Sequence, residues 1–186
     1  REALEIDTGA TLGDVRMAVK GSIADAGGSA PKVDLAAEAE HPNFANLLNL
    51  AIGYDTESAP EALAAPASAA ATIVGELPGL DIDATFDLAG GALTVQGRIE
   101  DLPGAPSYAL TSALDHPDAA TVFGLAGLGG AFADAPGPIT VSGRVAGNAD
   151  EISVPDLSAD LAGIPVDGSV AVSFAGARPS LTADLT

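Results

Sequence analysis

A two-residue alternation of apolar and acidic side chains is the feature that most constrains the fold of this chain. Between residues 80 and 88, Leu, Ile, Ala, Phe and Leu alternate with Asp, Asp, Thr and Asp. Successive side chains of a β-strand point to opposite faces of a sheet, so this period indicates strands with one apolar and one solvated face. Related alternation recurs at residues 15–20, 33–38, 93–99 and 170–174. We therefore expect a fold that is mainly β.

Turn signals rich in glycine and proline separate the alternating segments. They are Ala26-Gly27-Gly28, Pro78-Gly79, Ala89-Gly90-Gly91, Pro103-Gly104, Gly147-Asn148 and Ala175-Gly176. Such residues favour the tight turns of β-hairpins, which join antiparallel strands that are neighbours in the sequence. The pattern predicts a meandering antiparallel sheet. A closed β-sandwich or a solenoid remains the alternative, because both use the same alternation to build a dry core.

Short phrases recur along the chain with a spacing of about 75 residues, which indicates internal duplication. Val-Lys-Gly-Ser-Ile at 19–23 is echoed by Val-Gln-Gly-Arg-Ile at 95–99, and Glu-His-Pro-Asn at 40–43 is echoed by Asp-His-Pro-Asp at 115–118. A partial third copy follows. We expect three units, which are a first repeat at 1–71, a second repeat at 72–138 and a partial third repeat at 139–186.

Each repeat is expected to contain one short helix. After the two His-Pro steps the apolar residues fall at helical spacing, which predicts helices near 42–52 and 117–127. Pro42 and Pro117 then occupy the first helical turn, where a missing N–H has no intrahelical partner. The Ala- and Pro-rich residues 55–71 are expected to form a connector or a weak helix rather than a strand.

The charge balance excludes some classes of partner. Seven Lys and Arg against 26 Asp and Glu give a formal net charge of −19, which repels the phosphates of nucleic acids. We expect no nucleic acid as a partner. The absence of cysteine excludes disulfides and thiolate metal sites. The uncharged run between Asp118 and Asp134 is shorter than the roughly 20 residues that span a bilayer.

The titratable residues do not assemble into a recognisable catalytic or metal-binding motif. His41 and His116 both precede a proline at an expected helix start, which favours a capping or turn role. The acidic run that starts at Asp81 lacks the glycine and the carboxylate of a calcium loop, because Phe86 and Ala92 occupy those two positions. The many carboxylates could supply the acidic pair of a glycosidase, but glycosidase sites usually present aromatic platforms for sugars. This chain has two Tyr and no Trp, which argues against a glycosidase.

Two glycine-containing phrases fail as catalytic or nucleotide-binding motifs. The cluster at 127–130 has Phe132 where a dinucleotide fingerprint requires its third glycine, and no Walker lysine follows. The phrase around Ser29 has Pro31 in place of the closing glycine of a nucleophile elbow. We therefore expect that the chain is not an enzyme and that it has no catalytic residue, no metal site and no cofactor.

Several segments in the last third of the chain resemble AsmA-like bacterial envelope proteins of the AsmA, TamB and YhdP type. The resemblance lies in residues 137–145, 156–163, 168–170 and 178–185, and the two earlier His-Pro segments also resemble members of this family. It implies a curved antiparallel sheet with an apolar groove, shaped like a taco. It also implies that the segment lies in the periplasm and belongs to a longer parent protein, which is anchored in the bacterial inner membrane. The implied functions are lipid transport and outer membrane biogenesis.

We therefore expect a non-enzymatic segment that contacts or conducts phospholipid or another acyl-chain lipid between the two membranes, with envelope proteins as further partners. An acidic extracellular or surface protein, adhesin-like and weakly calcium-binding, is the alternative. The candidates for the lipid-contacting face are apolar residues of the alternating segments: Val15, Met17, Val19, Ile82, Phe86, Leu93, Val95, Ile99, Val170, Val172 and Phe174.

Overall fold

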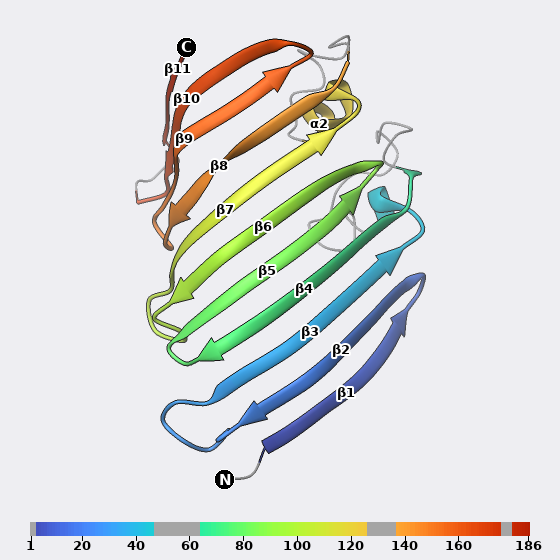
Figure 1. The fold of residues 1–186 in the computed structure, drawn as a ribbon, viewed down its shortest axis with the longest axis vertical. Coiled ribbons are helices and arrows are strands. Elements are labelled where there is room, and N and C mark those ends of the chain that lie inside the picture. The colour runs from blue at the N-terminus through green and yellow to red at the C-terminus, as the bar shows by residue number, and fades with distance from the viewer. Residues whose placement is uncertain (1–2, 47–63, 126–136, 176–179) are drawn as a thin grey trace.

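The computed structural model describes residues 3–46, 64–125, 137–175 and 180–186, and these form one antiparallel sheet of eleven strands (Figure 1). Strand order in the sheet follows sequence order from β1 to β11, so the sheet is a continuous meander. The strands are β1 (Ala3–Leu12), β2 (Val15–Ala24), β3 (Lys32–His41), β4 (Ala67–Glu76), β5 (Gly79–Leu88), β6 (Gly91–Glu100), β7 (Ser107–His116), β8 (Ile139–Gly147), β9 (Glu151–Leu161), β10 (Ile164–Ser173) and β11 (Ser180–Leu185).

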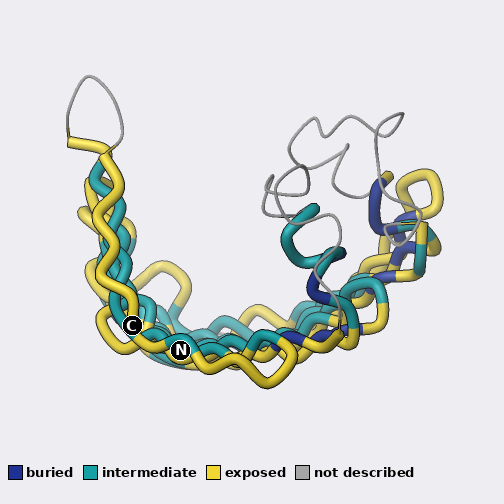
Figure 2. The backbone as a smooth tube through the Cα atoms, turned by 90° about the horizontal axis from the view of Figure 1, so that it is seen from above, coloured by how far each residue is buried: buried dark blue, intermediate teal, exposed yellow. Residues whose placement is uncertain are grey.

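The sheet is curved but not closed. Figure 2 shows the strands bent into an open trough, with the most exposed residues on the outside of the curve. Strands β1 and β11 each pair on one side only within the described residues and form the two free edges. The expected mainly β, antiparallel, curved sheet is confirmed. The closed sandwich or solenoid is excluded for the described residues, because no strand joins the edges and no second sheet covers a face.

Glycines inside the strands account for part of the curvature. Gly21 in β2 and Gly97 in β6 have φ angles of 139° and 153°, a region that side-chain-bearing residues essentially never adopt. At Gly97 an added Cβ would overlap the backbone carbonyl oxygen of Ala109 on the neighbouring strand β7. Glycine kinks of this kind bend a strand sharply, as at the corners of β-barrels. The recurring Val-x-Gly-x-Ile phrase is therefore a repeated bend.

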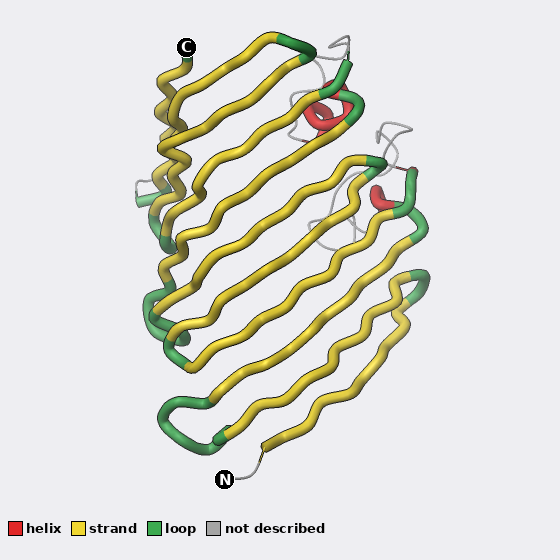
Figure 3. Tube along the Cα trace, viewed as in Figure 1, coloured by secondary structure: helices red, strands yellow, loops and turns green. Residues whose placement is uncertain are grey.

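The helical segments lie at one rim of the trough and on its inner side (Figures 2 and 3). Helix α2 (Ala119–Leu125) follows β7, and residues 44–46 are helical after β3. The expected helices near 42–52 and 117–127 are thus observed over residues 44–46 and 119–125, and the remainder of both ranges, apart from the residues just before each helix, lies outside the described residues.

The residues before each helical segment form the same polar turn at both His-Pro steps. The backbone N–H of Asn43 donates to His41 Nδ1 over 2.8 Å, and that of Asp118 donates to His116 Nδ1 over 3.0 Å. The carboxylate of Asp118 then accepts from the N–H groups of Ala120 and Thr121, as an N-cap does. The histidines therefore form the turn, whereas Asn43 and Asp118 hold the cap positions. Each proline lies one residue before its N-cap and not in the first helical turn.

Strand positions reveal how the repeats map onto the sheet. Strand β3 and strand β7 both end on the histidine of a His-Pro step, and each is followed by a helical segment. Three further strands follow in each case, β4 to β6 and β8 to β10. The same order of elements, four strands with a helical segment after the first of them, therefore occurs twice.

One expectation about the connector was wrong. Residues 55–71 were expected not to form a strand, but residues 67–71 belong to β4, which pairs with β3 and β5 along its whole length. Alanine has a low intrinsic strand propensity, and here pairing on both sides outweighs it. Residues 55–63 lie outside the described residues, and residues 64–66 precede β4 without strand structure.

Buried residues are few and lie mostly at the rim that carries the helices. The buried apolar side chains among the described residues are Val15, Phe44, Ala45, Ala67, Ala84, Ala119 and Ile139, and all but Ala84 lie at that rim. The chain exposes 11189 Å², whereas a compact globular protein of its 18.1 kDa mass would expose about 8,100 Å². A single curved sheet with one covered rim explains the difference.

We expect Asp118→Ala to lower the free energy of unfolding by about 1 kcal/mol, the usual cost of losing an N-cap. The Thr121 hydroxyl, followed by the Ala120 and Thr121 N–H groups, holds the pKa of Asp118 below its usual range. A carboxyl whose pKa is lowered by folding stabilises the native state above its unfolded pKa and loses this contribution as pH falls through the folded value. Urea unfolding at pH 7 and near pH 3 should therefore show a smaller difference between variant and wild type in acid.

A difference that stays the same at both pH values would contradict this assignment. The matched residue is Asn43, whose uncharged side-chain oxygen accepts a hydrogen bond from the N–H of Asn46. Asn43→Ala should weaken the other helix start by a similar amount, but without the acid dependence.

Candidate functional site

The register of the sheet places apolar side chains of all eleven strands on one face. Val19 faces Ala37, which faces Ala71, then Ala84 and then Val95, so one row runs from β2 to β6 without a charged residue. The same alternation continues through β7 to β11, where Val170 of β10 faces Ala183 of β11. We call this surface the apolar face. It lies on the concave, less exposed side of the trough (Figure 2).

Ten of the eleven candidate residues lie on the apolar face. The structure brings them together from four strands: Val15, Met17 and Val19 on β2, Ile82 and Phe86 on β5, Leu93, Val95 and Ile99 on β6, and Val170 and Val172 on β10. Phe174 differs from the others. It lies one residue beyond β10, where its N–H donates to the Asp150 carbonyl, and 46% of it is exposed.

The apolar face is open over much of its area. On the edge strands, Leu12 is 61% exposed and Leu181 is 69% exposed, and Met17 on β2 is 41% exposed. Toward the middle of the sheet the apolar residues are half-buried, and Ala84 is the only one buried there among the described residues. Contiguous exposed apolar surface is a common feature of interaction sites.

Small side chains occupy many positions of the apolar face on its middle strands. Alanine occupies four neighbouring positions of β3 and β4, where Ala37 faces Ala71 and Ala39 faces Ala69. Glycine occupies others, such as Gly97 opposite Ile82 and Leu110. Aromatic and leucine side chains flank this strip, with Phe86 facing Leu93. Sequence reasoning identified the large apolar residues but not the alanine strip of β4, because that segment was not expected to be a strand.

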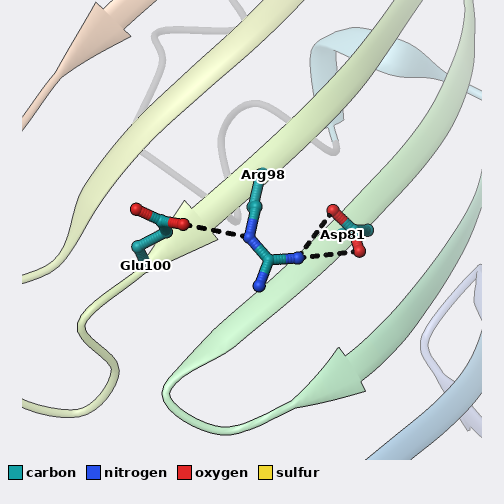
Figure 4. Close-up of polar contacts among 3 residues, drawn as sticks. All are labelled: Asp81, Arg98 and Glu100. Carbon is teal, nitrogen blue, oxygen red and sulfur yellow. Dashed lines mark hydrogen bonds and ion pairs between the residues drawn. The ribbon is translucent and has the colours of Figure 1, made fainter.

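The opposite, convex face is polar and carries ion pairs between neighbouring strands. Arg98 on β6 bonds Asp81 on β5 at 2.9 Å and Glu100 at 3.1 Å (Figure 4). Arg144 pairs with Asp156 at 3.0 Å. The hydrogen bonds that the guanidinium donates to Asp81 and then to Glu100 raise the pKa of Arg98. These pairs are exposed, so they fix strand partners and contribute little to stability.

The acidic alternation of β5 is explained by this convex face. Asp81 binds Arg98, and Asp83 accepts a hydrogen bond from Gln96 at 3.1 Å. The described residues contain no group of three or more His, Cys, Asp or Glu that could hold a metal ion. The strands thus carry side chains that pair across strands on the convex face and apolar side chains on the concave face.

The two histidines lie beside the apolar face, at the rim that carries the helices. His116 is 2% exposed, and its Nε2 atom has no hydrogen-bond partner. The ring packs against Gly91 of β6, where an added Cβ would overlap it. His41 is 7% exposed and borders a pocket of about 530 Å³ that mixes both signs of charge, including Arg16 and Glu40.

No family model, no curated protein and no solved structure matches this chain. Within the described part of the chain, none of the helical segments has the length and apolar character needed to cross a bilayer.

Proposed function

We propose that the apolar face binds the acyl chains of lipids, and that the chain is a non-enzymatic segment of an AsmA-like bacterial envelope protein. In this proposal the segment lies in the periplasm, where it contacts or conducts phospholipid between the inner and outer membranes and supports outer-membrane assembly. Its parent protein is anchored in the inner membrane, and other envelope proteins are its partners.

A single observation carries the proposal: an open, curved sheet whose concave side is apolar on every strand and remains partly exposed. Burial of apolar surface contributes roughly 25 cal/mol per Å², or about 0.8 kcal/mol per methylene, so an acyl chain along this face would be held without any polar contact. The alanine and glycine positions leave width for such a chain. The mechanism is passive and requires no cofactor.

The alternative, an acidic surface or adhesin-like protein, depends on strands that close on a dry core. The described strands instead form an open sheet with partly exposed leucines. The calcium site of that alternative also has no supporting carboxylate cluster among the described residues. These observations favour the lipid-binding proposal.

The test is lipid extraction from the purified protein followed by mass spectrometry. The wild type should carry phospholipid in stoichiometric amounts, and a variant with Val95→Asp and Val172→Asp should lose it, because both changes put carboxylates on the apolar face. The matched control is Thr94→Asp with Ala171→Asp, which adds the same charge to the same strands on the opposite face.

Circular dichroism must show that both variants retain the sheet. Lipid in the control and none in the apolar-face variant supports the proposal. A wild type without lipid, even after incubation with phospholipid vesicles, would refute lipid binding by this segment.

A further inference from the structure

Every lysine and arginine among the described residues points away from the apolar face. They are Arg16, Lys20, Lys32, Arg98 and Arg144. Each alternates with the apolar positions of its strand and therefore lies on the convex face, as when Arg16 faces Glu40 across β2 and β3. Three of the five are already paired with carboxylates there. Within the described residues, the concave side therefore carries no lysine or arginine.

The rims of the trough, where strands turn, are acidic. In an antiparallel meander the turns alternate between the two rims, so Asp25, Asp101 and Asp150 lie along one rim, and Asp14 and Asp118 lie along the other. The described turns contain no lysine or arginine. Figures 1 and 3 show these turns at the two ends of the strands.

A lipid with its acyl chains on the apolar face must leave its headgroup in water above that face or at a rim. At a rim, an anionic headgroup would meet these carboxylates, whereas the cations closest to the rims in the sequence, Arg16 and Lys32, belong to the convex face. At physiological ionic strength charges interact over about 8 Å, so the carboxylates nearest the headgroup contribute most. A zwitterionic headgroup instead presents an ammonium group that these carboxylates attract.

We propose that the apolar face selects zwitterionic phospholipids over anionic ones with the same acyl chains, and that the acidic rims are the selecting element. This inference rests on the proposed function, since it names the class of lipid that the same surface accepts. The selectivity is electrostatic, so added salt diminishes it, whereas the acyl-chain contact is independent of salt.

The experiment offers lipid-free protein to vesicles that contain equal amounts of phosphatidylethanolamine and phosphatidylglycerol with identical acyl chains. The protein is then re-isolated, and the bound lipid is quantified by mass spectrometry. At low salt the bound fraction should be enriched in phosphatidylethanolamine by roughly threefold, the order expected from one or two carboxylates within a Debye length. The enrichment should approach one in 0.5 M salt, where the Debye length is only about 4 Å.

Matched variants locate the selecting charges. A rim variant with Asp25→Asn, Asp101→Asn and Asp150→Asn should lose most of the enrichment. A convex-face variant with Asp34→Asn, Asp83→Asn and Asp167→Asn changes the net charge equally and should keep it.

The outcomes separate the two proposals. Equal uptake of both lipids at low salt would overturn the selectivity while leaving acyl-chain binding intact. Equal loss of enrichment in the two variants would overturn the assignment of the selectivity to the rims. No uptake of either lipid would overturn the proposed function and the selectivity with it.

Discussion

Replacing Gly97 by alanine is expected to lower the free energy of unfolding by about 3 kcal/mol or more. Two costs add at this position. The φ angle of 153° lies in a region restricted to glycine, which costs about 1–3 kcal/mol for another residue. The new Cβ also overlaps the carbonyl oxygen of Ala109, a backbone atom that can move only if the β6–β7 pairing is disturbed.

Urea unfolding followed by far-ultraviolet circular dichroism measures this effect. Gly27→Ala is the matched control, because the same Cβ at Gly27 meets no atom within 4 Å. That change should fall within about 0.5 kcal/mol of wild type, as most surface substitutions do. Equal stability of the Gly97 and Gly27 variants would show that the bend in β6 is not enforced by glycine.

The second large effect is expected at His116. Because this side chain is 2% exposed, His116→Ala should cost about 3 kcal/mol through the cavity it leaves and the lost acceptor for the Asp118 N–H. His116→Phe keeps the packing, and it also removes the Nε2 atom that has no hydrogen-bond partner. Only the bond to Asp118 is then lost, so a cost of about 1 kcal/mol is expected.

Unfolding of the two variants under the same conditions distinguishes packing from hydrogen bonding. Equal losses would mean that the polar turn, rather than packing, makes His116 important. His41→Ala provides the internal comparison, because His41 makes the same bond to the N–H of Asn43 at 2.8 Å and is similarly buried.

The bends at Gly21 and Gly97 are features whose sequence repeat was recognised but whose structural role was not predicted. The phrases around Gly21 and Gly97 were recognisable as copies of one another. Their significance as kinks depends on φ and on how closely the next strand approaches, and neither is encoded in a one-dimensional pattern. The alanine run of β4 was missed for a related reason, since its strand conformation comes from pairing with β3 and β5 rather than from local preference.

The sequence by itself indicated an antiparallel meander and the helical segments after the His-Pro steps. It also indicated the strands β2, β3, β5, β6 and β10, together with the side chains that share one face of each. These depend on local periods and turn residues, which act over a few neighbouring positions. Only the tertiary structure decided that the sheet stays open, that its apolar side is concave and that every described cation lies on the outside. A closed core and an open trough require the same alternation, so the choice between them depends on curvature accumulated over many strands.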